Sequence, residues 1–113
     1  MPWHSPWFGT LRLPTNGLSN QLTTLLRAKD AAQFTPSEVI RFLWCTIQAD
    51  EDLGAGNIWI GNSNVSSSEF GWHLVATQSV SIPASESNLL IANDVWFISD
   101  TDAVDIHVSF LTR

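Results

Sequence analysis

The sequence predicts an all-β domain, a small β-sandwich or jelly-roll-like barrel of about seven or eight short strands. The 113 residues are 44% hydrophobic, so a folded core is expected and wholesale disorder is not. From residue 39 onward, short runs rich in β-branched and aromatic residues follow one another, several with a period of two. Clusters of Gly, Pro, Asn, Asp and Ser separate these runs. This spacing of strands and turns is typical of sandwiches and small barrels.

Residues 1–17 differ from the rest, and we expect them to form an extended N-terminal arm in front of a β-sandwich domain over residues 18–113. The segment contains three prolines, which disfavour helices and central strands. Its aromatic side chains, Trp3, Trp7 and Phe8, should not remain in water. They either fold back on the domain or dock on a neighbour. The second is favoured, because an extended Pro-rich segment loses little entropy when it docks.

Residues 18–35 fit two structures. Four leucines are spaced as on one face of a helix, and a serine near its start could cap it. The stretch 22–26 also fits a strand followed by a polar loop. We favour the strand because all of the downstream segments are β. The residues of the helical alternative are Leu18, Ser19, Leu22, Leu25 and Leu26.

The remaining strands are predicted in chain order. The run 39–49 is the longest and is apolar on both faces for part of its length. The last segment, 104–110, alternates most regularly, since apolar residues at even positions face a core and polar residues between them face water. The predicted strands are 39–49, 57–61, 72–76, 79–82, 89–92, 95–99 and 104–110.

Charge excludes some functions. The formal net charge is −6, and the five Lys and Arg residues form no cluster, so binding to nucleic acid is not expected. No apolar stretch approaches the length of a membrane span, and no signal-peptide pattern is evident. We therefore expect a protein made in the cytoplasm that stays soluble until it meets a partner. Only 14% of the residues are charged, which favours a surface partly buried against that partner.

No residue pattern points to catalysis, a metal or a cofactor, so we expect a protein that is not an enzyme. The histidines lack ligand spacing and nucleophile motifs are absent. The single cysteine, Cys45, lies in an apolar run and is expected to be a buried small hydrophobe. The acidic turns 50–52 and 100–105 are interpreted as solvated turns, and calcium binding by them remains the alternative.

The chain has six Trp and six Phe residues, which either fill the core or form a binding surface. We select Trp3, Trp7, Phe8 and Trp72 as partner-binding candidates. One alternative function is a carbohydrate-binding module in which Trp72 or Trp59 stacks on sugar rings.

Three ordered motifs are more specific than composition. They are Ile47-Gln48-Ala49, Asn57-Ile58-Trp59-Ile60-Gly61 with the loop that follows, and Val95-Trp96-Phe97-Ile98-Ser99 before a final strand. Over residues 39–111 the chain resembles small structural proteins encoded by tailed bacteriophages, which have similar "IYIG", "SNVT" and "YVISDT" stretches. The sequence departs from that pattern at Trp59 and Trp96, where the family usually has Tyr, and at residues 69–72.

The resemblance implies a virion structural protein. Family members of this kind are β-sandwiches, often trimeric, that decorate or cement a capsid. It implies as partners the major capsid protein and other copies of the chain in a homotrimer, at the capsid surface of a virion made in the host cytoplasm. A tail or head-to-tail adaptor component is the alternative within the same class. No cofactor is implied.

Overall fold

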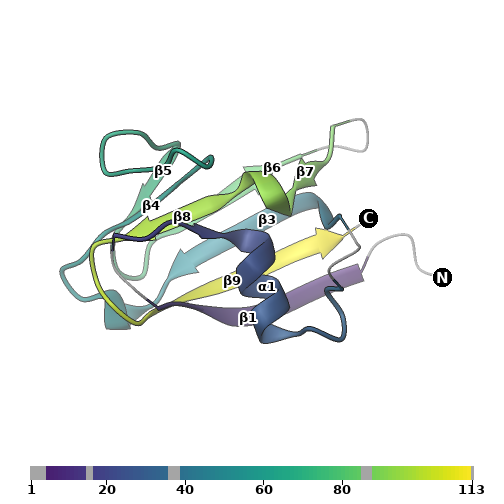
Figure 1. Cartoon of the computed structure of the whole chain (residues 1–113), viewed down its shortest axis with the longest axis horizontal. Helices are drawn as coiled ribbons and strands as arrows, with labels where there is room; N and C mark the ends of the chain where they lie inside the picture. The colour runs from purple at the N-terminus through teal and green to yellow at the C-terminus, as the bar shows by residue number, and fades with distance from the viewer. Residues whose placement is uncertain (1–4, 15–16, 36–38, 85–87, 113) are drawn as a thin grey trace.

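The structure is a computed structural model that describes residues 5–14, 17–35, 39–84 and 88–112. It consists of two antiparallel sheets packed face to face (Figure 1). Sheet A has the order β1 (Ser5–Leu13), β9 (Val104–Thr112), β3 (Arg41–Ala49) and β6 (Ser79–Pro83), with β7 (Leu90–Ile91) also paired to β3. Sheet B has the order β2 (Asn20–Gln21), β8 (Trp96–Ser99), β4 (Ile58–Gly61) and β5 (Trp72–Leu74). One α-helix, α1 (Leu22–Lys29), and two 3-10 turns, η1 (Glu51–Leu53) and η2 (Ala92–Asp94), complete the described part.

The connectivity is that of a jelly roll. Apart from the two-residue β7, successive strands lie in different sheets except for the fourth and fifth, with the first, eighth, third and sixth in sheet A and the second, seventh, fourth and fifth in sheet B. This confirms the predicted small β-sandwich. In the described part of the chain the two sheets do not close into a barrel. The described helix is too short to cross a membrane.

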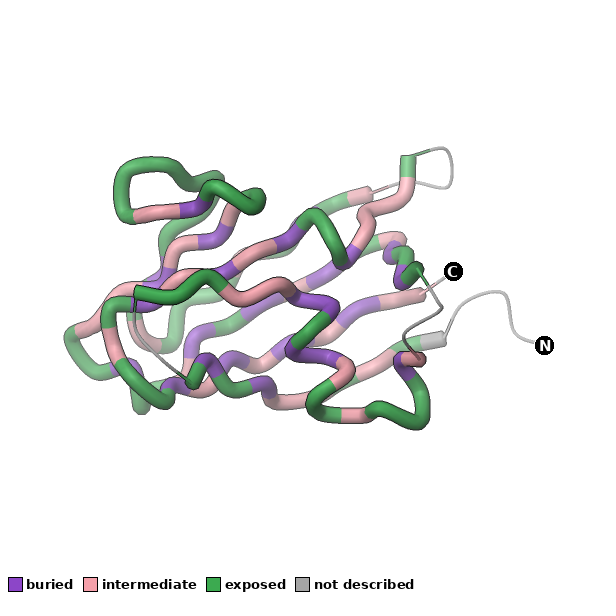
Figure 2. The backbone as a smooth tube through the Cα atoms, viewed as in Figure 1, coloured by how far each residue is buried: buried purple, intermediate pink, exposed green. Residues whose placement is uncertain are grey.

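Strand β9 lies in the middle of sheet A and shows the predicted alternation. Val104, Ile106, Val108 and Phe110 are buried, and the residues between them are half-buried on the other face. Figure 2 shows the same alternation of buried and partly exposed residues along the long strands. Each sheet therefore has an inner face toward the core and an outer face toward solvent.

The aromatic centre of the core surrounds Phe110. Its ring lies 4.2 Å from that of Phe42 and 5.2 Å from that of Trp7, the latter almost parallel at 17°. Phe34 adds an edge contact to Trp7 at 5.6 Å. These rings come from β1, β3, β9 and the segment after α1, so the core depends on contacts between residues that are distant in the sequence.

The arm expected over residues 1–17 takes a different place. Its central part is β1, which pairs with β9 along its whole length, from Ser5 opposite Thr112 to Leu13 opposite Val104. It is an integral edge strand of the sandwich and not an arm laid on a neighbour. Trp3 lies outside the described residues. The physical reason is the alternation within the segment: Trp7, Leu11 and Leu13 bury against the core, which offsets the cost of ordering the strand.

The strand favoured within residues 18–35 is also wrong. The structure has the helix α1, and the helical alternative described its spacing correctly, since Leu22, Leu25 and Leu26 are buried on one face. Gln21, and not Ser19, is the residue at the N-cap. Figure 1 shows α1 in front of β1 and β9, where the short sheet B does not extend. The period of the leucines is the stronger signal, and the β-character of the distant segments says nothing about local structure.

A β-bulge explains the apolar run in β3. The register between β3 and β9 shifts between Phe42 and Trp44. Without the extra residue, both side chains would lie on one face of the sheet. The bulge instead buries Phe42 in the core and turns Trp44, 36% exposed, to the outer face. Cys45 is fully buried beside them, as expected, and burial raises the pKa of its thiol to about 12.

Candidate docking face on sheet A

The outer face of sheet A is organised in rows that cross its four strands, because strand register aligns one outward residue from each. The first row is apolar: Pro6 lies opposite Leu111, Leu111 opposite Trp44, and Trp44 opposite Pro83. All four are exposed or half-buried. Phe8, in the next row, is 72% exposed, the largest value among the exposed large hydrophobic residues. These five residues lie together at one end of the face, and we call them the apolar strip.

The middle of the face is polar and uncharged. Opposite Phe8 lies a row of hydroxyl side chains, Ser109, Thr46 and Ser81. Thr46 and Ser81 hydrogen-bond each other through their hydroxyls at 2.9 Å. A shallow groove of about 390 Å³ runs between Phe8 and Gln48. Such small, mutually bonded side chains leave a flat surface that a partner covers without desolvating a charge.

The opposite end of the face carries the charges. Arg12 forms an ion pair with Asp105 at 3.1 Å, in the register expected for cross-strand neighbours. Asp50 and Asp52 approach Asp105, so that one oxygen of each of the three carboxylates lies within 4.8 Å of the others. The two acidic turns are separate in the sequence, and the fold brings them together. Arg12 already compensates part of this negative charge, and no second feature of the described residues points to a metal ion.

A chain of hydrogen bonds joins Thr10, His107 and Asp50. The Thr10 hydroxyl lies 3.0 Å from His107 Nδ1, and His107 Nε2 lies 2.7 Å from Asp50 Oδ1. The bond from His107 lowers the pKa of Asp50. A hydroxyl, an imidazole and a carboxylate in this order can transfer a proton, as in nucleophilic catalysis. Catalysis of that kind also needs donors for an oxyanion, and the nearby Gln48 amide already donates to the Thr77 carbonyl.

The aromatic residues of sheet B form a different surface. Trp59 lies between His73 on β5 and Ile98 on β8 in register. The Trp59 and His73 rings stack at 5.6 Å and 13°. His73 therefore lies against one face of the Trp59 indole and leaves less of it free to stack on a sugar. This arrangement does not favour the carbohydrate-binding interpretation for Trp59.

A polar network fixes this end of sheet B. His73 Nε2 lies 2.7 Å from Asn57 Oδ1, and the Asn57 amide donates to Asp100 Oδ2 at 2.9 Å. Asp100 also accepts from the Asn57 backbone N–H at 2.7 Å. These bonds from Asn57 are the main cause of the lowered pKa of Asp100.

We expect the lowered pKa of Asp100 to make the fold less stable in acid. A carboxylate whose pKa is lower in the folded state stabilises the fold above its unfolded pKa, near 3.9, and loses this contribution as the pH falls through the folded pKa. The free energy of unfolding should therefore decrease between about pH 5 and pH 3. Denaturant titrations across this range test it. Asp100→Asn should flatten the decrease, and equal pH profiles of this variant and the wild type would contradict the prediction.

The predicted partner-binding residues do not form one site. Phe8 lies in the apolar strip, Trp7 packs against the core on the opposite face of β1, and Trp72 lies at the other side of the sandwich. Sequence reasoning missed Trp44, Leu111 and Pro83. The alternation in β9 could have placed Leu111 outward, but the bulge that turns Trp44 outward has no local signal in the sequence.

Comparisons with known proteins give little beyond the fold. No protein-family model matches the chain, and no curated protein matches it in sequence. Among solved structures, the chain is similar to one from the cryo-EM structure of the giant freshwater prawn Macrobrachium rosenbergii extra small virus (XSV) VLP. The sequences are 8% identical, the TM-score is 0.46, and the match covers 99% of this chain and 80% of that chain. A similarity at this level implies nothing about function.

Proposed function

We propose that this protein is a structural component of a virion that docks on a neighbouring protein subunit through the outer face of sheet A. In its finer form, the proposal is a cement or decoration protein of a bacteriophage capsid, bound to the major capsid protein and to copies of itself as a homotrimer. A tail or adaptor role uses the same face. The observation that carries the docking part is the apolar strip beside a flat uncharged surface.

Energetics support this choice of face. The apolar strip puts Trp44 and Leu111 opposite each other, with Phe8 in the next row of the same paired strands. A rigid, preformed surface loses little entropy on association. Aromatic residues in the centre of a desolvated surface contribute most of the binding free energy of interfaces. Repeated copies on a shell add avidity, so each contact can be modest.

The virion part is supported by the resemblance of residues 39–111 to phage structural proteins and by the jelly-roll connectivity. Jelly rolls are frequent in viral capsid proteins, and lectins and cupins share them. The net charge of −6 favours an external position over one against the genome, because the phosphates of nucleic acid would repel the chain.

Phe8→Asp is expected to lower incorporation of the protein into particles at least about tenfold, because a carboxylate would be desolvated within the apolar part of the docking face. Particles produced with the variant or the wild type are purified by density gradient, and the chain is quantified by mass spectrometry. Leu18→Asp is the matched control, since Leu18 is also highly exposed, at 61%, but precedes the edge of sheet B. Equal incorporation of Phe8→Asp and the wild type would contradict docking through this face.

We also propose that the protein acts without catalysis. The bonds of Thr10, His107 and Asp50 are then structural, and join β1, β9 and the end of β3 across the face. The purified protein is expected to hydrolyse p-nitrophenyl acetate no faster than an equal concentration of free imidazole. A faster reaction that disappears in His107→Gln would overturn this proposal.

A further inference from the structure

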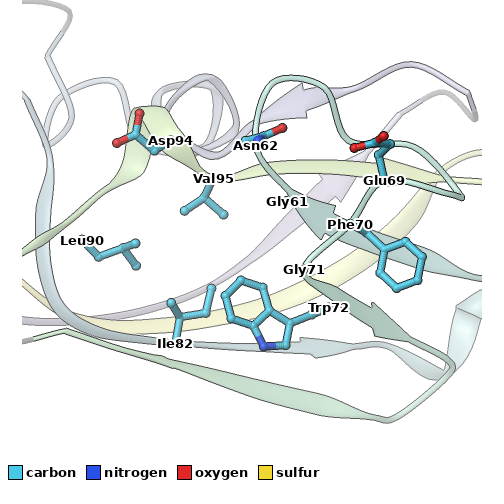
Figure 3. A pocket seen from close by; sticks show the side chains of 10 residues that line it. All are labelled: Gly61, Asn62, Glu69, Phe70, Gly71, Trp72, Ile82, Leu90, Asp94 and Val95. Atoms are coloured by element: carbon cyan, nitrogen blue, oxygen red, sulfur yellow. The ribbon is translucent and has the colours of Figure 1, made fainter.

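The sandwich is open on the side where β5 and β6 end the two sheets. A cleft of about 350 Å³ lies there. Figure 3 shows the side chains of Trp72, Ile82, Leu90 and Val95 around a common space. Ile82 and Val95 are buried, at 5% and 4% exposed, and form its floor. The floor of the cleft thus consists of apolar side chains that belong to the core of the fold.

Trp72 is an inner-face residue that the core leaves partly uncovered. It lies opposite Ile60, whose side chain is fully buried, so it points into the space between the sheets. It is nevertheless 38% exposed. The reason is its position on the edge strand β5, beyond which neither sheet continues. An apolar occupant of the cleft would complete the burial of this ring.

The Trp72 indole also has an unused donor. Its Nε1–H donates to no residue in the described part of the chain. By contrast, Trp96 Nε1 donates to the Asn93 carbonyl at 3.1 Å. An occupant with a carbonyl oxygen, such as a peptide backbone, would accept this hydrogen bond.

Two carboxylates lie on the rim. Glu69 and Asp94 both line the cleft and are exposed, and Figure 3 places them toward opposite ends of it. Within the described ranges, neither forms an ion pair with a basic side chain. The net charge of −6 adds a negative field around them. An occupant that carries positive charge at its two ends would be attracted and oriented.

We propose that this cleft binds a short extended segment of a partner protein in which an apolar side chain is flanked by basic residues. The apolar side chain packs against Trp72, Ile82 and Val95. A backbone carbonyl accepts from the Trp72 indole, and the two basic residues lie near Glu69 and Asp94. This site is separate from the outer face of sheet A, so a negative result for one of the two proposals does not contradict the other.

The test uses the full chain labelled with ¹⁵N and the synthetic pentapeptide acetyl-KGLGK-amide. Signals of the Trp72 indole N–H and of residues 69–72 should shift, with a dissociation constant on the order of 1 mM, as expected of a flexible peptide. Acetyl-EGLGE-amide and acetyl-KGSGK-amide should each bind at least about threefold more weakly, since one loses charge complementarity and the other the apolar contact. Equal binding of the three peptides, or shifts that map away from the cleft, would overturn the proposal.

Substitutions in the chain separate the contributions of the rim carboxylates and of the Trp72 indole donor to peptide binding. The double substitution Glu69→Gln with Asp94→Asn should weaken binding about 3- to 10-fold and reduce its dependence on salt. Glu51→Gln, an exposed carboxylate outside the cleft, is the charge control and should leave binding unchanged. Trp72→Phe keeps an aromatic ring without the donor and should bind more weakly than the wild type. Phe8→Asp should bind the peptide normally, which distinguishes this site from the docking face.

Discussion

Phe110→Ala is expected to lower the free energy of unfolding by about 3–5 kcal/mol, enough to leave a small domain largely unfolded. The substitution removes a fully buried ring that contacts Trp7, Phe34 and Phe42, and so leaves a cavity between β1, β3 and β9. Chemical denaturation followed by tryptophan fluorescence measures the loss.

The control for this prediction is Phe8→Ala. Phe8 lies on the neighbouring strand β1 but faces outward. Its truncation should change the free energy of unfolding by no more than about 0.5 kcal/mol. If both substitutions cost the same, the placement of the core on one face of sheet A would be wrong.

Gly9→Ala is expected to destabilise the protein by about 1–3 kcal/mol, because a Cβ at residue 9 would overlap the Trp7 indole. Trp7 lies over Gly9 on the inner face of β1 and stacks on Phe110 there. The Trp7 ring can therefore occupy this position only because residue 9 has no side chain.

A double-mutant cycle measures this dependence. In a Trp7→Leu background the overlap is gone, so Gly9→Ala should cost at least about 1 kcal/mol less than in the wild type. Gly71→Ala is the control glycine, since a Cβ there meets only the Ile60 carbonyl oxygen at 3.5 Å. Additive costs in the cycle would contradict the contact between Trp7 and residue 9.

Much of the fold could be predicted where a strand has one dry and one wet face. The alternation of apolar and polar residues in β9 predicts Phe110 on the inner face and His107 on the outer one, and both lie there. The spacing of the leucines predicts the helix α1, but the β-character of the other segments was given more weight. Local period was the better guide, because it reflects which face of the element is buried.

Less of the candidate site could be predicted from the sequence. Both Trp7 and Phe8 were predicted to bind a partner, although adjacent residues of a strand point to opposite faces. This error followed from treating the segment as an arm and not as a strand. Trp44 depends on the bulge, and the meeting of Asp50 with Asp105 depends on the pairing of β3 with β9. Both are consequences of tertiary pairing that no local pattern encodes.

The central claim is that the outer face of sheet A is covered by a neighbouring protein subunit in an assembled particle. A cryo-EM map of particles that contain this chain tests it most directly. We predict density of a neighbouring subunit over Phe8, Trp44 and Leu111. A map in which these side chains face open solvent, while another face of the sandwich contacts the particle, would contradict the account.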